Sequence, residues 1–259
     1  MKHTVITEKK EQIAIVKINR PQAYNSFDLE TINRLEQAFL TYSLDNSIRG
    51  VVLTGVGKAF CAGGDLKWIW THKENYGDAF YQLATIYHHA IVEIRRMPKP
   101  VVAAINGFAA GGGFSMALAC DFRIMESSAI LRQAYTSNGL SIDGGGTFTL
   151  PRMVGMAKAM EIAVFDPIIP ADKALEWGLV TEVVEDGQGL DAAIELVKHI
   201  GSGSLHSFAA SKALIYDSFS NSLEAQLELE RRLLRRCGDH PNGQEGVRAF
   251  VEKRKPVFT

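Results

Sequence analysis

Residues 101–118 read VVAAINGFAAGGGFSMAL, an uncharged stretch in which the consecutive glycines Gly111 to Gly113 separate two apolar segments. The first segment is typical of a buried strand and the second of a buried helix. A glycine inside a helix costs about 1 kcal/mol relative to alanine, so the cluster requires a reason. Glycine permits either close packing of neighbouring backbone or open access to an amide group. The stretch predicts a strand, a turn and the start of a helix, with both interpretations of the glycines open.

The segment 50–70 repeats this arrangement. It runs from GVVLTG, a predicted strand, through the glycines of KAFCAGGDL into a region with a helical pattern. Amide groups at a helix start lack partners inside the helix and favour a negative atom nearby. Two such turns that face one site offer N–H donors from Gly64 and Gly112 to a developing oxyanion. Neither turn matches the GxGxxG dinucleotide fingerprint or the GxxxxGK[ST] phosphate loop.

The composition is that of an ordinary globular protein, with 259 residues, of which 46% are hydrophobic. A net charge of −1 argues against a nucleic-acid partner. The cysteines, Cys61, Cys120 and Cys237, contain no CxxC pair, which predicts reduced thiols, a cytoplasmic location and no metal site. The N-terminus lacks an apolar signal segment. Residues 101–120 are uncharged and long enough to span a bilayer, but they contain glycines and an asparagine, so we expect no membrane contact.

Strands and helices alternate over the first 190 residues, which predicts an α/β fold with a largely parallel sheet. A helical pattern continues to the end of the chain, and Leu223, Leu227 and Leu234 form an apolar stripe on it. The expected strands are 12–19, 50–55, 101–105, about 121–125 and 179–184. The expected helices begin after Asp28, include Trp68, span 83–96, follow the glycine cluster, begin after Pro151 and lie within 169–178.

Six motifs together resemble the enoyl-CoA hydratase/isomerase (crotonase) family, from about residue 5 to 259. In chain order they are NRPQAYNSF, KAFCAGGDL, PKPVVAAINGFAAGGGFSMALACDFRI, LPRMVGMAKAMEI, ADKALEWGLV and EGVRAFVEKRKPVF. The resemblance implies a spiral of ββα units in a catalytic core, 1–195, followed by a helical trimerisation region, 196–259. It also implies acyl-CoA thioester substrates, whose enolate oxygen is held by the backbone amides of Gly64 and Gly112.

The same resemblance implies where coenzyme A binds, as part of the substrate and with no further cofactor. It implies a homotrimer or a dimer of trimers, in which a neighbouring subunit supplies part of the CoA site. The CoA-binding positions within the subunit are Ala23, Ala62, Gly63, Asp65 and Leu66, and those from the neighbour are Phe250 and Lys253. Two of these residues have simpler interpretations, because Asp65 also suits a helix cap and Lys253 a solvated surface position.

The chain departs from the family at the two glutamates that flank a water in its hydratases. The first position is three residues after Gly112 and is Ser115 here, and the second is Tyr135. Neither side chain is an effective base near neutral pH. This departure argues against ordinary hydration of a 2-enoyl thioester by two glutamates.

A different carboxylate, Asp143, lies in GLSIDGGGTF, where several family isomerases and the aryl-CoA dehalogenases carry their catalytic aspartate. The alternative is that Asp143 caps the turn that follows it, as aspartates before glycines often do. His88 stands twelve residues before Pro100, the spacing at which dehalogenase-like members carry a general-base histidine, although it also suits an ordinary helix face. Tyr135 falls where those members place an aromatic donor to the aspartate.

Three interpretations of the function follow. The first is an isomerase in which Asp143 moves a proton between two carbons of an acyl-CoA and the amides of Gly64 and Gly112 hold the enolate. The second is a hydratase, hydrolase or dehalogenase of a cyclic or aromatic acyl-CoA that uses Asp143 and His88. The third, from another class, is a non-catalytic acyl-CoA-binding or RNA-binding relative.

Overall fold

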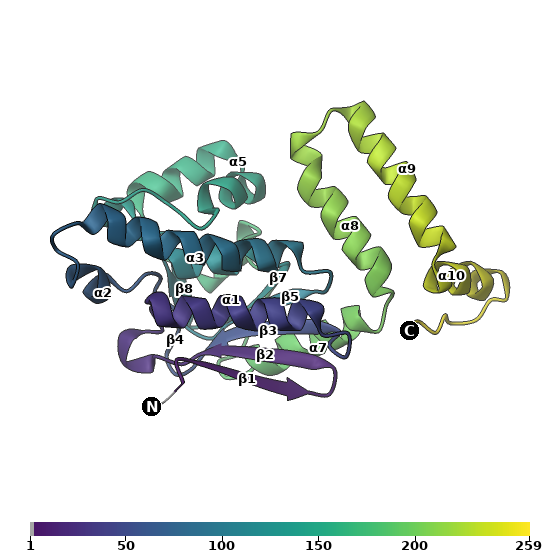
Figure 1. The fold of residues 1–259 in the computed structure, drawn as a ribbon, viewed down its shortest axis with the longest axis horizontal. Helices are drawn as coiled ribbons and strands as arrows, with labels where there is room; N and C mark the ends of the chain where they lie inside the picture. The colour runs from purple at the N-terminus through teal and green to yellow at the C-terminus, as the bar shows by residue number, and fades with distance from the viewer. Residues whose placement is uncertain (1–2) are drawn as a thin grey trace.

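The computed structural model describes residues 3–259, which form two β-sheets, helical layers against them and a projecting group of C-terminal helices (Figure 1). The larger sheet has the order β1-β2-β3-β5-β7-β10, and all its neighbouring pairs are parallel except the β1–β2 hairpin. Its strands, by label, are Val5–Lys10, Ile13–Ile18, Gly50–Gly55, Val101–Ile105, Phe122–Glu126 and Glu182–Val184. The predicted α/β fold with a largely parallel sheet is confirmed.

Ten helices, α1 to α10, accompany the sheets in the described chain. Their bounds are Leu29–Leu44, Leu66–Trp70, Tyr76–Arg96, Gly112–Ala119, Gly146–Phe165, Ala171–Glu176, Gly189–Gly201, Leu205–Asp217, Leu223–Asp239 and Pro241–Val251. Helices α1 and α3 run side by side over one face of the larger sheet, and α7 covers the other face (Figure 1).

Strand β2 shows why the sequences of the strands in the larger sheet are apolar at consecutive positions. Ala14 and Val16 belong to the main core beneath α1 and α3, whereas Ile13 and Ile15 pack with α7 on the opposite face. Successive strand residues point to opposite sides of a sheet, so a strand covered on both faces must be apolar throughout. The prediction of a covered strand at 12–19 is therefore confirmed.

A smaller sheet, with the order β4-β6-β8-β9, lies beside the larger one and was not expected from the sequence. Its strands are Ala59–Cys61, Phe108–Ala110, Ile130–Arg132 and Ile169–Pro170. Strands β3, β5 and β7 of the larger sheet are each followed by a short strand of the smaller one and then by a helix. These are the ββα units that the resemblance implies.

Several element boundaries differ from the predictions, among them the start of strand β10, which begins at Glu182 instead of residue 179. Helix α3 begins at Tyr76 instead of residue 83, because Asn75 caps it by accepting the N–H of Asp78. Helix α5 begins at Gly146 and includes Pro151, so the prediction of a start after Pro151 is wrong. Gly155, with φ of 77°, interrupts α5, and Pro151 lies in the first of the two resulting segments.

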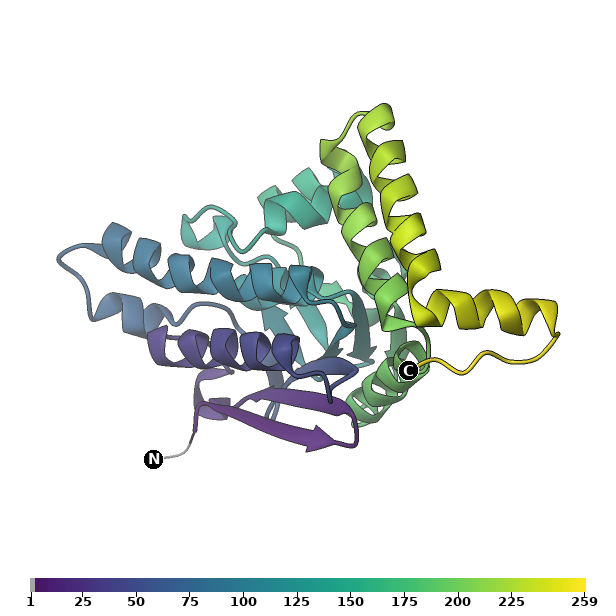
Figure 2. The same cartoon turned by 45° about the vertical axis from the view of Figure 1, so that its right-hand side comes forward.

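Helices α8, α9 and α10 project away from the sheets (Figure 2). Helix α8 is anchored by Lys212, whose buried ammonium donates to the carbonyl of Ile94 at 3.0 Å and to Asp121 at 2.8 Å. The apolar stripe of α9 lies in solvent, with Leu223 69% and Leu234 74% exposed. Such a stripe is typical of an association surface, so self-association through this region stays a prediction.

We expect the double change Leu227→Asp and Leu234→Asp to dissociate an oligomer into smaller species without unfolding the core, because charges on this stripe oppose apolar contact. Light scattering gives the molar mass, and circular dichroism gives the helix content. The control is Arg231→Ser on the same helix, which leaves the leucines intact. An unchanged molar mass in the double variant would show that α9 does not drive association.

Candidate active site

The smaller sheet brings three distant segments of the chain to one edge. Strands β4, β6 and β8 are parallel, with Cys61 opposite Ala109 and Ala110 opposite Arg132. The residues after each strand therefore leave the sheet on the same side and meet there. The backbones of Gly63 and Gly112 approach each other closely, because a Cβ added to Gly63 would lie only 2.7 Å from the amide nitrogen of Gly112. The two glycine turns that echo each other in the sequence thus face one site.

The glycines of the 111–113 cluster have different roles. Gly113 packs against β4 so closely that a Cβ would overlap the carbonyl of Cys61. Gly111 adopts a φ of 53°, which favours glycine, and donates its N–H to Arg132. The N–H of Gly112, at the start of α4, and that of Gly64 both lack an acceptor among residues 3–259. Both interpretations of the cluster, close packing and open amides, therefore hold for different glycines.

A cavity of about 170 Å³ lies between these turns and helix α3. Its apolar wall is formed largely by aromatic and leucine side chains, and both Gly64 and Gly112 lie on its surface. The charged residues on the wall are Asp143 and Arg132, and Arg132 forms an ion pair with Asp166 at 3.1 Å. The carboxylate of Asp143 is therefore the available acid or base on this wall. The apolar and aromatic lining comprises Phe27, Ala62, Leu66, Phe80, Leu83, Ala84, Tyr87, Phe108, Ala110, Ala134 and Leu140.

The side chain of Asp143 is hydrogen-bonded by Tyr135, whose hydroxyl donates to Oδ1. Burial raises the pKa of Asp143 above its usual value, and this effect exceeds the opposing influence of the Tyr135 hydrogen bond and of His88. Burial and the nearby Asp143 charge raise the pKa of Tyr135, so the phenol stays protonated at neutral pH and acts as a donor. The pair is thus a carboxylate of increased basicity with a fixed hydrogen-bond donor.

His88 lies beside this pair but not on the cavity wall. Its Nε2 is 3.7 Å from Oδ2 of Asp143, and it accepts the N–H of Gly144 at 3.3 Å. Nε2 therefore lies between the backbone N–H of Gly144 and the carboxylate of Asp143. Asp143 does not cap α5, because that helix begins behind Gly145 with no side-chain cap. The carboxylate is instead directed to Tyr135 and His88.

Comparisons with known proteins show the family to which this chain belongs. A model of the enoyl-CoA hydratase/isomerase family matches residues 8–259. The chain belongs to the enoyl-CoA hydratase/isomerase family. It is 34% identical to 1,2-epoxyphenylacetyl-CoA isomerase of Escherichia coli, over 100% of this chain and 99% of the relative. It is 39% identical to a probable enoyl-CoA hydratase of Rhodobacter capsulatus, over 99% and 98% of the two chains. An enoyl-CoA hydratase structure from Polaromonas superposes with a TM-score of 0.94 at 35% identity, over 98% and 99% of the chains.

The positions at which the resemblance to the enoyl-CoA hydratase/isomerase family predicts CoA contacts lie on two neighbouring segments. Ala23 ends the turn Pro21–Ala23, and the next residue, Tyr24, accepts the N–H of Ala62 at 3.0 Å, which holds this turn beside the 62–66 segment. Asp65 caps α2 by accepting the N–H groups of Lys67 and Trp68, and it pairs with Arg20 at 2.8 Å. The side chain of Asp65 is therefore already engaged, as its interpretation as a helix cap expects.

Phe250 and Lys253 do not approach this site within one chain. Phe250 is in α10 and is 85% exposed, Lys253 follows that helix, and α10 lies far from α2 and β8 in Figure 1. Their expected role depends on a second subunit and stays a prediction.

The aromatic wall of the cavity was not predicted from the sequence. Phe80, Leu83 and Tyr87 recur at helical spacing in α3 and line the cavity. This spacing is the available sequence signal, but it is equally typical of core packing. Ser115, at the first hydratase glutamate position, is fully buried off the cavity wall, and its hydroxyl has no partner.

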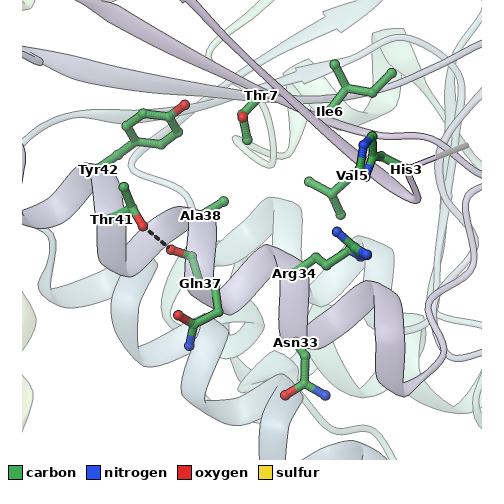
Figure 3. Close-up of a pocket in the computed structure, with 10 residues that line it drawn as sticks. All are labelled: His3, Val5, Ile6, Thr7, Asn33, Arg34, Gln37, Ala38, Thr41 and Tyr42. Carbon is green, nitrogen blue, oxygen red and sulfur yellow. Dashed lines mark hydrogen bonds between the residues drawn. The ribbon is translucent and has the colours of Figure 1, made fainter.

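A wider hollow of about 630 Å³ lies between β1 and α1 (Figure 3). Its residues include Arg34 and Thr41, whose hydroxyl donates to the carbonyl of Gln37. No carboxylate lines it, so it offers no equivalent of Asp143. Within residues 3–259, no helix is long and apolar enough to cross a bilayer, and no cluster of side chains is arranged to hold a metal ion.

We expect Asp143→Asn to raise the melting temperature by about 1–3 °C at pH 7. The raised pKa of Asp143 means that its ionised form destabilises the folded state, an effect present above that pKa and lost as the pH falls through it. The gain should therefore shrink as the pH approaches 4. Calorimetry across this range tests the expectation against Asp217→Asn on the exposed end of α8. A gain that increases on acidification would contradict it.

Proposed function

We propose that this enzyme isomerises a double bond in an acyl-CoA thioester, with Asp143 as the base that moves the proton. The observation that carries the proposal is one partly buried carboxylate of raised pKa on an apolar wall that also presents the free amides of Gly64 and Gly112. One carboxylate is sufficient for isomerisation, because the group that accepts the proton can return it at another carbon.

The chemistry begins with the thioester carbonyl oxygen between the two amides. Asp143 takes a proton from the carbon α or γ to the carbonyl, and the bonding electrons move into an enolate whose negative oxygen is stabilised by Gly64 and Gly112. Each such donor contributes about 3–4 kcal/mol to a transition state of this kind. Asp143 then delivers the same proton to the other end of the allylic system, so no atom is gained or lost. Tyr135 donates to the ionised carboxylate and orients it.

The position of His88 favours this reaction over the addition of water. The Nε2 atom accepts from Gly144, and the ring lies off the cavity wall. A water activated by His88 would need that lone pair. The two glutamates of the family's hydratases are also replaced, by Ser115 and Tyr135.

A second candidate is a hydratase, hydrolase or dehalogenase of a cyclic or aromatic acyl-CoA. Its support is the 3.7 Å separation of His88 Nε2 from Asp143, together with a wall that contains Phe27, Phe80 and Tyr87. The names of the relatives include both isomerase and hydratase. A non-catalytic acyl-CoA-binding role leaves the burial of Asp143 without a purpose.

We also propose a cytoplasmic homotrimer or dimer of trimers that needs no cofactor besides the CoA of its substrate. The nucleotide would lie along residues 20–25 and 62–66, and Phe250 and Lys253 of a neighbouring subunit would reach it. The support is family membership together with the exposed ends of α9 and α10.

We expect Asp143→Asn to lower the turnover of 3-enoyl-CoA or ring-containing acyl-CoA substrates by about 10²–10⁴, because the amide keeps the shape but cannot take a proton. Ser115→Ala should lose less than about tenfold, since it removes at most one hydrogen bond. A panel of thioesters assayed by mass spectrometry in ¹⁸O-labelled water provides the measurement. Substantial activity in Asp143→Asn on the substrate that the wild type turns over would exclude Asp143 as the base.

His88→Ala separates the two candidate reactions in the same assay. A small effect with no ¹⁸O in the product supports isomerisation. A loss equal to that of Asp143→Asn, with ¹⁸O incorporated by the wild type, supports activation of water.

We expect Gly112→Pro to abolish turnover while the fold survives, because proline is accommodated at the start of a helix but carries no amide proton. Gly112→Ala is the steric control, since its Cβ would lie 2.8 Å from Phe27 but the N–H remains. Proline should lose at least about 10² more in rate than alanine. Equal rates in the two folded variants would remove Gly112 from the oxyanion hole.

A further inference from the structure

Tyr87 is a fully buried polar side chain whose contacts connect the two halves of the site. It lies on the inner face of α3, is 1% exposed, and donates its hydroxyl to the carbonyl of Gly112 at 2.5 Å. That carbonyl belongs to the first residue of α4, whose N–H is the proposed oxyanion donor. The hydrogen bond therefore restrains rotation of a glycine that has no side chain to restrain it.

The same phenol also packs against the loop that carries Asp143. A Cβ on Gly144 would overlap the hydroxyl and ring of Tyr87, so the phenol lies directly on the backbone next to Asp143. The following residue of α3, His88, accepts the N–H of Gly144 at 3.3 Å. Two consecutive residues of one helix thus contact a loop in which Gly144 and Gly145 both have positive φ.

Phe27 extends these contacts to the second amide donor. Its ring centroid is 4.8 Å from that of Tyr87. Its backbone N–H donates to Gly63 at 2.8 Å, and its carbonyl accepts from Asp65 at 2.9 Å, which fixes the backbone on both sides of Gly64. Tyr87 therefore contacts the backbone of Gly112 and the backbone next to Asp143 directly. Through the ring of Phe27 it also contacts the segment that contains Gly64.

We propose that Tyr87 is a positioning residue that holds the amide of Gly112 and the carboxylate of Asp143 at the separation required for enolate formation. This inference rests on the proposed oxyanion hole and base. Glycine-rich segments carry high backbone freedom, and small displacements of reacting groups have large effects on rate. Burial and the neighbouring acidic groups raise the pKa of Tyr87 well above its usual value, so at neutral pH its hydroxyl is available as a donor.

The test is Tyr87→Phe, with Tyr81→Phe as the matched control on the same helix, where the side chain is 79% exposed. The probe is butyryl-CoA labelled with ¹³C at its carbonyl. Isotope-edited infrared spectroscopy reports the shift of the bound carbonyl stretch to lower frequency, and exchange of its α-protons in D₂O reports enolate formation. Binding of free CoA and thermal unfolding report whether each variant is folded.

We expect Tyr87→Phe to lose a large part of the carbonyl shift and to slow α-exchange about tenfold, while the Kd for free CoA changes less than twofold. Tyr81→Phe should match the wild type. A folded Tyr87→Phe protein with wild-type shift and exchange overturns the role of Tyr87 and leaves the oxyanion hole intact. Absence of a carbonyl shift in the wild type overturns the oxyanion hole itself, and the inference with it.

A second variant applies if Tyr87→Phe does not fold. Replacement of Tyr87 by 3,5-difluorotyrosine keeps the ring and the donor while making the phenol more acidic. A positioning role predicts an unchanged carbonyl shift and an unchanged pH profile of α-exchange. A displaced pH profile would make the phenol an acid–base group and overturn the proposal.

Discussion

The close approach of the Gly63 and Gly112 backbones is the constraint on which the site depends. No L-residue with a Cβ fits at either Gly63 or Gly113, because Gly112 and Cys61 occupy the space. The approach exists because β4 and β6 are parallel neighbours whose carboxyl ends leave the smaller sheet together. The larger sheet provides stability through its doubly covered strands, whereas the smaller sheet determines where the amides of the site lie.

This arrangement has an energetic cost that is concentrated at the reacting groups. Within residues 3–259 the amides of Gly64 and Gly112 have no hydrogen-bond acceptor, and partial burial of Asp143 opposes its ionisation. Buried polar groups without full hydrogen bonding are unfavourable in a stable fold. In the proposed reaction, a thioester oxygen between the amides would satisfy both donors at once, and a proton from the substrate would neutralise the carboxylate.

The sequence predicted the elements that local chemistry determines. Strand β2 follows from an apolar run, and α1 from the cap at Asp28, which accepts the N–H of Thr31. The strands β4, β6 and β8 have too few residues to show a period, and their pairing depends on contacts far along the chain. The direction of the Asp143 side chain depends on positive φ at the glycines behind it, which a sequence of glycines permits but does not specify. The resemblance to the family predicted that Asp143 lies in the site. The residues alone were also compatible with Asp143 as the cap of a turn.

The two positions that the resemblance assigns to the hydratase glutamates carry no carboxylate here, and the carboxylate on the cavity wall comes from another loop. Ser115 lies on α4, buried and without a partner, and carries no charge toward the cavity. Tyr135, at the second position, donates to Asp143, so a position that holds a carboxylate in hydratases here supports a carboxylate from another loop. Tyr135 follows β8, and Asp143 lies in the glycine-rich loop before α5, so the change requires that loop to reach the same sheet edge. Tyr87 fills the space beside Gly144, which ties the position of that loop to α3 and to the amide of Gly112. The position of Asp143 therefore depends on the glycine-rich backbone around it and on the packing of Tyr87 against that backbone.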